Sequence, residues 1–95
     1  MILGIVVGTV VSSQCESGIP GARFLLVERC NQHGELRKDF LVALDPLGAG
    51  KGEMVMLSES TSARETPLTL GKPIDTLIVG IIDLIDQDEQ IVYRK

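Results

Sequence analysis

The sequence predicts an all-β chain folded into a small closed or nearly closed barrel of five or six short strands, with at most one short helix. Three observations support this prediction. Apolar runs rich in valine, isoleucine and leucine recur along the 95 residues. Glycine, proline and polar clusters separate these runs at short intervals, and stretches with helical periodicity are scarce. A barrel also removes the exposed edges that so many short strands would leave in an open sheet.

Each expected strand begins and ends where the composition changes. The first run, residues 1–11, is almost wholly apolar. We expect a buried strand there, because a signal peptide would need basic residues before the run and a membrane span would need a longer one. The expected strands are residues 2–12, 23–30, 39–45, 53–58, 76–86 and 90–95. A hairpin turn is expected at residues 31–36, and any helix within residues 58–70 or near Asp75.

Composition limits the kinds of partner that the chain can bind. Its 95 residues give room for one domain, residues 1–95, and its formal net charge of −4 argues against nucleic acid and against anionic membranes as partners. Hydrophobic residues make up 44% of the chain but aromatic residues only 3%, so the core must be aliphatic. The mean hydropathy of +0.24 is high for so small a chain. We therefore expect an oligomer that buries part of the apolar surface.

The residues that most often bind metals or perform catalysis form no familiar pattern. Cys15, Cys30 and His33 offer at most three ligands, in spacings unlike those of zinc motifs. We interpret Cys30 as a small apolar core residue and Cys15 as a loop residue, and two free thiols fit a reducing cytoplasm. No Ser-His-Asp or Cys-His set is evident, and His33 precedes Gly34 in an expected turn. We therefore expect no catalytic residue, no metal and no cofactor.

The glycine-rich segment DPLGAGKGE, residues 45–53, looks like a phosphate-binding loop. Aligned to a Walker A motif, it has Asp45 in place of the first glycine and Gly52 in place of the hydroxyl that binds magnesium. Aligned to a dinucleotide-binding motif, it has Glu53 in place of the third glycine. A strand rather than a helix is expected to follow, so nucleotide binding is not expected. The glycines suit either a plain hairpin loop or close packing against a neighbouring subunit.

The same loop begins a longer pattern. DPLGAGKGEMVM is followed in order by STSAR, PID and IVGIID, and the chain opens with ILGIVVGTVVSS. Together these segments resemble the EutN/CcmL family, the pentameric vertex proteins of bacterial microcompartment shells. The chain departs from the family pattern at Ser60 and Thr61, where a glycine is common. Its first loop, QCESGIPG, also lacks the Lys or Arg often found there.

The resemblance implies an OB-like barrel and a structural role in the bacterial cytoplasm. A shell tiled only with hexagons stays flat, so pentagons at its corners supply the curvature that closes it. The implied assembly is a homopentamer that caps these vertices beside hexameric shell proteins and has no enzymatic activity. The alternative from the residues alone is a small OB-like module that binds nucleic acid or an oligosaccharide. Phe24, Phe40 and Tyr93 would then have to stack on the ligand, in a chain with little basic clustering.

The resemblance also implies which residues lie between subunits. It places the glycine loop at or near the contacts around the ring axis, where Lys51 and Glu53 would recur; the alternative for both is a solvated loop charge. Arg64 is expected to fix a loop or an interface by binding a carboxylate or backbone carbonyls. Its candidate partners are Asp45, Glu53, Asp75 and Asp83. The axis-loop residues are Asp45, Gly48, Ala49, Gly50, Lys51, Gly52 and Glu53. The interface or loop-fixing residues are Ser62, Ala63, Arg64 and Asp75.

Overall fold

Seven β-strands account for most of the residues that the structure describes. A computed structural model describes residues 1–11, 21–59 and 76–95. The strands are β1 (Ile2–Val10), β2 (Phe24–Cys30), β3 (Leu36–Leu44), β4 (Met54–Glu59), β5 (Thr76–Ile81), β6 (Leu84–Gln87) and β7 (Gln90–Arg94). These three segments contain no helix that is long and apolar enough to cross a membrane. The helix expected within residues 58–70 or near Asp75 lies outside the described residues, except that residues 58 and 59 belong to β4.

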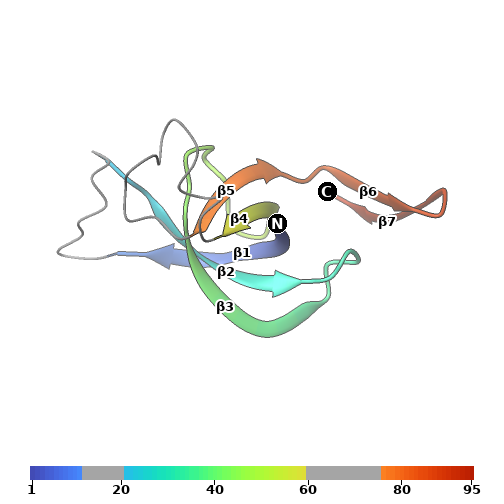
Figure 1. Cartoon of the computed structure of the whole chain (residues 1–95), viewed down its shortest axis with the longest axis horizontal. Helices are drawn as coiled ribbons and strands as arrows, with labels where there is room; N and C mark the ends of the chain where they lie inside the picture. The colour runs from blue at the N-terminus through green and yellow to red at the C-terminus, as the bar shows by residue number, and fades with distance from the viewer. Residues whose placement is uncertain (12–20, 60–75) are drawn as a thin grey trace.

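Five of the strands close into a barrel in the order β1-β2-β3-β5-β4 (Figure 1). All neighbouring strands are antiparallel except β3 and β5, which pair in parallel at Leu44 and Leu77. The barrel closes because β1 pairs with β2 along one edge and with β4 along the other. The prediction of an all-β chain with a small closed barrel is confirmed.

Alternating side chains of the strands fill the barrel with aliphatic groups, as the composition predicts. In β2, Leu25 and Val27 are fully buried while Leu26 between them is only half-buried. This alternation places one face of the strand toward the core. The buried core cluster comprises Val6, Leu25, Val27, Ala43, Ala49, Val55, Leu57 and Ile78. Close packing explains Gly4, because a side chain there would clash with Val27 and with the carbonyl of Glu28.

The turn predicted between the second and third strands is confirmed. The side-chain Oδ1 of Asn31 accepts hydrogen bonds from the N–H groups of His33 and Glu35, each at 2.9 Å. Gly34 adopts a positive φ of 83°, which glycine tolerates without strain. The third strand begins earlier than predicted, at Leu36, because Leu36 already pairs with Cys30 of β2, and an irregularity next to Lys38 separates this pair from the rest of the ladder. The Glu28 carboxylate accepts the Lys38 N–H at 3.0 Å and so stabilises this irregularity.

The prediction of one continuous strand over residues 76–86 is wrong. β5 ends at Ile81. The next residue, Ile82, donates its N–H to the Met54 carbonyl at 2.8 Å, and beyond this hydrogen bond the chain leaves the barrel. β6 and β7 then pair with each other in a separate hairpin that projects beyond the barrel (Figure 1). Asp88 and Glu89 in its turn have φ values of 53° and 67°. Two positive φ values are typical of a tight hairpin turn, and this turn falls in the gap left between the expected strands at residues 76–86 and 90–95.

Candidate functional site

The glycine-rich loop at residues 45–53 connects β3 to β4, and its first half is built around Asp45. The side chain of Asp45 is fully buried. Its carboxylate accepts hydrogen bonds from the N–H groups of Leu47, Gly48 and Ala49 at 3.0, 3.0 and 2.9 Å. The Nη1 of Arg23 lies 3.5 Å from the same carboxylate. These contacts offset the cost of burying a charge, which would be high for an unpaired carboxylate.

The second half of the loop is built around Glu53. Its Oε1 accepts the Gly50 N–H at 2.6 Å, and its Oε2 lies 2.6 Å from the Nζ of Lys95. The Lys95 ammonium, and next the Gly50 N–H, lower the pKa of the Glu53 carboxyl below its ordinary value of 4.5. The Glu53 carboxylate in turn raises the pKa of Lys95 above 10.5. Both groups are therefore charged at neutral pH, and the pair connects the loop to the base of the β6–β7 hairpin.

The glycines in this loop answer two different needs. Gly48 and Gly52 have φ values of 80° and 89°, a backbone conformation that other residues rarely adopt. Gly50 has no such requirement, but a Cβ built there would lie 3.3 Å from the Oε1 of Glu53. The glycine at this position therefore permits the close approach of its own N–H to the Glu53 carboxylate.

The loop is also attached to the barrel core. Ala49 is fully buried in the core cluster. Gly52 donates its N–H to the Val6 carbonyl at 2.8 Å, and Val6 donates to the Glu53 carbonyl at 3.0 Å. The part of the loop left in solvent comprises Pro46, Leu47, Gly48, Lys51 and Gly52.

These contacts give a physical reason why the loop differs from a phosphate-binding loop. Such a loop needs a cluster of N–H groups that are free to bind phosphate oxygens. Here residues 47–49 donate to Asp45, Gly50 donates to Glu53, and Gly52 and Glu53 donate to backbone carbonyls. The chain's own carboxylates thus occupy the positions that a phosphate would take. The strand β4 follows the loop, as the sequence predicts.

The structure gathers the axis-loop residues predicted from the sequence into one ordered element. The remaining predicted contact residues, Ser62, Ala63, Arg64 and Asp75, lie outside the described residues, as does Cys15. Among the candidate partners of Arg64, Asp45 and Glu53 already bind Arg23 and Lys95, respectively. Asp83 is exposed at the base of the hairpin, 3.8 Å from the Lys95 Nζ.

Sequence reasoning missed two functional residues of the loop, Arg23 and Lys95. Arg23 contacts the loop twice, because its Nη2 also donates to the Ala49 carbonyl at 3.3 Å. Both cations lie far in sequence from the carboxylates that they bind. Only the pairing register of β2 with β3, and the return of the β6–β7 hairpin to the barrel, bring them to the loop.

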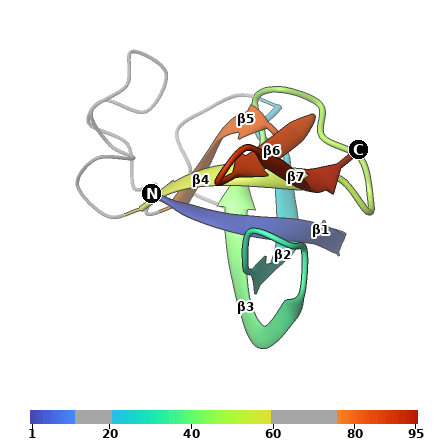
Figure 2. The same ribbon diagram turned by 90° about the vertical axis from the view of Figure 1, so that its right-hand side faces the viewer.

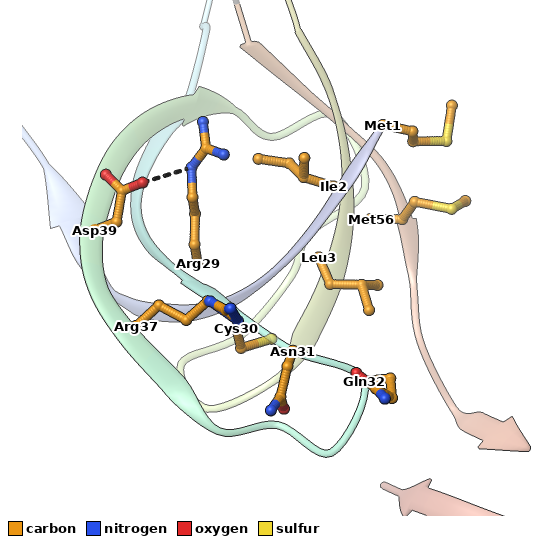
Figure 3. Close-up of a pocket in the computed structure, with 10 residues that line it drawn as sticks. All are labelled: Met1, Ile2, Leu3, Arg29, Cys30, Asn31, Gln32, Arg37, Asp39 and Met56. Carbon is orange, nitrogen blue, oxygen red and sulfur yellow. Dashed lines mark ion pairs between the residues drawn. The ribbon is translucent and has the colours of Figure 1, made fainter. Parts of the chain in front are cut away.

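A separate cavity of about 760 Å³ lies between the start of β1, the β2–β3 turn and β4 (Figure 3). Its lining residues are Met1, Ile2, Leu3, Arg29, Cys30, Asn31, Gln32, Arg37, Asp39 and Met56. The Nε of Arg29 lies 2.9 Å from Asp39 in an ion pair without hydrogen-bond alignment, and its Nη2 donates to Glu59 at 2.9 Å. Two carboxylates thus balance the Arg29 charge within the chain.

Burial keeps the Cys30 thiol at this cavity in its protonated form. Cys30 is buried, as the sequence predicts, and burial raises the pKa of its thiol above 9.0. A thiol with a raised pKa is a poor nucleophile at neutral pH. His33 lies exposed in the β2–β3 turn. Within residues 1–11, 21–59 and 76–95, no three His, Cys, Asp or Glu side chains gather as metal ligands would.

Comparisons of the sequence and of the structure with known proteins identify the same family and the same fold. The family model described as ethanolamine utilisation protein EutN/carboxysome matches residues 1–83. The carboxysome shell vertex protein CcmL of Thermosynechococcus vestitus is 39% identical over 90 residues, which cover 95% of this chain and 91% of the relative. The solved structure of CcmL from Gloeobacter violaceus superposes with a TM-score of 0.92 at 38% identity, covering 100% of this chain and 98% of the other. The pentameric microcompartment shell protein GrpN of Rhodospirillum rubrum superposes with a TM-score of 0.82 at 36% identity, covering 92% and 99%.

Proposed function

This chain belongs to the EutN/CcmL family, and from that premise we propose that it acts through assembly rather than through chemistry. Within the bacterial cytoplasm it is a component of a microcompartment shell, where a homopentamer of the chain caps each vertex. The observation that carries this function is the agreement in fold over the whole chain with vertex and pentameric shell proteins. The proposal adds that the ring contacts hexameric shell proteins along its rim and that the chain is not an enzyme.

Five copies around a point are what a flat hexagonal layer needs in order to curve. A ring of this kind requires an interface in which one surface of each subunit contacts a different surface of the next. Within residues 1–11, 21–59 and 76–95, eight large apolar side chains remain exposed in a single copy, which is in keeping with such burial between subunits. They are Met1, Val11, Leu36, Phe40, Val42, Leu47, Leu84 and Ile91.

We place the glycine loop at the contacts around the ring axis. In support, Asp45 and Glu53 hold the loop in one shape from within, and a preorganised loop loses little entropy on association. Its exposed part would meet the neighbouring copies and consists of Pro46, Leu47, Lys51 and the two positive-φ glycines. Asp45 and Ala49 would then support the contact from beneath. Ser62, Ala63, Arg64 and Asp75 remain proposed as interface or loop-fixing residues on the strength of the motif.

The alternative function, an OB-like module for nucleic acid or oligosaccharide, has less support. Phe24 pairs with Leu44 at the end of β3, whereas Phe40 lies in the middle of β3, opposite Glu28. Tyr93 belongs to the separate hairpin, where its ring would lie 3.5 Å from a Cβ placed at Gly34. The three aromatic side chains thus come from different parts of the fold. A stacking surface for bases or sugars would require them to lie side by side.

Native mass spectrometry over a dilution series tests the proposed assembly. A pentamer of the 10.3 kDa chain would appear at 5 × 10.3 kDa, about 51.5 kDa. We expect this species to persist on dilution. A chain that remained a monomer or dimer at every concentration would contradict the proposed function. Co-expression with a hexameric shell protein, followed by electron microscopy, tests whether the pentamer is needed for closed polyhedra rather than open sheets or tubes.

A further inference from the structure

Two separate parts of the molecule expose apolar side chains, and they differ in charge. The first is the outer face of β3, where Phe40 and Val42 are 54% and 47% exposed. Val42 lies opposite the half-buried Leu26 of β2, so the two side chains share a face. The second is the β6–β7 hairpin, where Leu84 and Ile91 are 47% and 51% exposed. Clustered apolar exposure of this kind marks an interaction surface.

The first part, which we call the β3 surface (Leu36, Phe40, Val42 and the adjoining Arg37 and Lys38), also has an open strand edge. β2 pairs with one edge of β3 along most of its length. Within the described residues, the other edge of β3 pairs only at Leu44, with Leu77 of β5. Figure 1 shows β3 curving away from the barrel over its first half. A long strand edge with apolar neighbours is prone to aggregation unless another segment covers it.

The second part, the β6–β7 hairpin, pairs with no third strand among the described residues. An isolated two-stranded hairpin is only marginally stable in water, so this one needs further contacts. The hydrogen bond from the Lys95 N–H to the Asp83 carbonyl, 2.9 Å, closes the open end of the hairpin. Two contacts then fix the hairpin to the barrel: Lys95 pairs with Glu53, and the Nε2 of Gln32 donates to Gln87 at 2.8 Å. The hairpin therefore projects in a defined direction.

The charges of the two surfaces are complementary. In the hairpin, β6 and the turn at residues 83–89 carry three aspartates and one glutamate, while the other strand ends in Arg94 and Lys95, of which Lys95 pairs with Glu53. Arg37 and Lys38 are both exposed in the first half of β3, where Arg37 also lines the cavity. Asp39, the next residue of β3, also lines the cavity and already pairs with Arg29, so it adds little repulsion. Complementary charges around an apolar contact favour one partner and one orientation.

We propose that the β6–β7 hairpin of one copy docks on the β3 surface of the neighbouring copy, and that repetition of this contact closes the ring. The inference rests on the proposed function, because a ring needs two different contact surfaces on every chain. The hairpin and β3 meet that need: Figure 2 shows them on different sides of the molecule. Leu84 and Ile91 would pack against Phe40 and Val42, which removes the exposed apolar groups of both surfaces at once.

The test uses two variants, each of which damages one surface. The hairpin variant carries Leu84→Asp and Ile91→Asp, and the β3 variant carries Phe40→Asp and Val42→Asp. Since all four side chains are about half exposed, we expect both chains to fold, and circular dichroism with thermal unfolding checks this. Each variant alone should lose the pentamer signal in native mass spectrometry. The matched control, Thr9→Asp at an exposed position of β1, should remain pentameric.

Mixing the two folded variants gives the decisive result. The hairpin variant keeps an intact β3 surface, and the β3 variant keeps an intact hairpin, so an equimolar mixture can form one native contact and no more. We expect a 1:1 heterodimer at 2 × 10.3 kDa, about 20.6 kDa, and no ring. Either variant remaining pentameric, or a mixture of folded variants remaining monomeric, would overturn the docking. A wild-type chain that never forms a pentamer would instead contradict the proposed function itself.

Discussion

Replacing Asp45 by alanine should destabilise the chain more than any other single change in the glycine loop. The substitution removes a fully buried carboxylate that accepts three backbone N–H groups and faces Arg23. A hydrogen bond to a charged group contributes about 1.5–3 kcal/mol, but three bonds to one carboxylate are not additive. Because the Arg23 side chain is half exposed, water can solvate it once its partner is removed, so the loss comes mainly from N–H groups left without an acceptor. An unsatisfied buried group costs about 1–3 kcal/mol, and we expect the free energy of unfolding to fall by about 2–4 kcal/mol.

Two further variants separate the contributions to this loss. Asp45→Asn keeps one acceptor oxygen but places an NH₂ group toward the Ala49 N–H and Arg23, so we expect an intermediate loss of about 1–3 kcal/mol. Lys51→Ala, at an exposed position of the same loop, is the matched control and should change stability by less than about 0.5 kcal/mol.

The assay is urea unfolding followed by circular dichroism, with all variants at one protein concentration because assembly adds to apparent stability. A small domain has only about 5–15 kcal/mol of stability, so the Asp45→Ala variant should unfold at a much lower urea concentration. If Asp45→Ala behaved like Lys51→Ala, the carboxylate would not be what shapes the loop, and the structural account of DPLGAGKGE would be wrong.

Three further predictions concern the same loop and the core. Gly50→Val should weaken the pentamer more than the barrel, because the valine side chain would displace the Glu53 carboxylate. A variant that stays fully pentameric in native mass spectrometry would count against placing the glycine loop at the ring axis. The difference in the free energy of unfolding between wild type and Glu53→Gln should have its maximum value between pH 4.5 and 10.5. It should shrink as acid protonates Glu53, whose pKa is lowered, and as base deprotonates Lys95, whose pKa is raised; a pH-independent difference in urea midpoints would contradict this. In a Cys15→Ala background, Cys30 should react with a thiol reagent at pH 8 more slowly than the same thiol in the urea-unfolded chain, because burial raises its pKa and keeps it protonated; equal rates would disprove it.

The sequence predicted the strands of the barrel well but not the point where the chain leaves it. The run TLIVGIIDLID is apolar on both sides of its first aspartate, so composition alone favours one strand. The structure ends β5 at Ile81 and starts β6 at Leu84, with Asp83 exposed between them. The break depends on the length of β4, whose first residue, Met54, binds Ile82 and leaves nothing beyond it to pair with. That limit is a property of the closed barrel and is not visible in the local sequence.

The pairing of Arg23 with Asp45 shows a second limit of the sequence. Continuing the register of the Cys30–Leu36 pair back along the hairpin would place Arg23 opposite Ala43. The irregularity that the Lys38 conformation introduces shifts the pairing by two residues, so that Phe24 pairs with Leu44 and Arg23 comes beside Asp45. Because an irregularity of this kind has no reliable sequence signature, the cation that binds Asp45 could not be identified beforehand.

The acidic residues that flank the glycine loop explain why it looked like a phosphate-binding loop and is built differently. Both kinds of loop use glycine to turn N–H groups toward a negative charge. In this chain that charge is part of the loop itself: Asp45 at its start binds the N–H groups of its first half, and Glu53 at its end binds Gly50. A carboxylate three or four residues from a glycine cluster can satisfy the cluster without any ligand. In a loop of this composition the flanking acids therefore favour a rigid, self-contained shape, which is what a contact repeated around a ring requires.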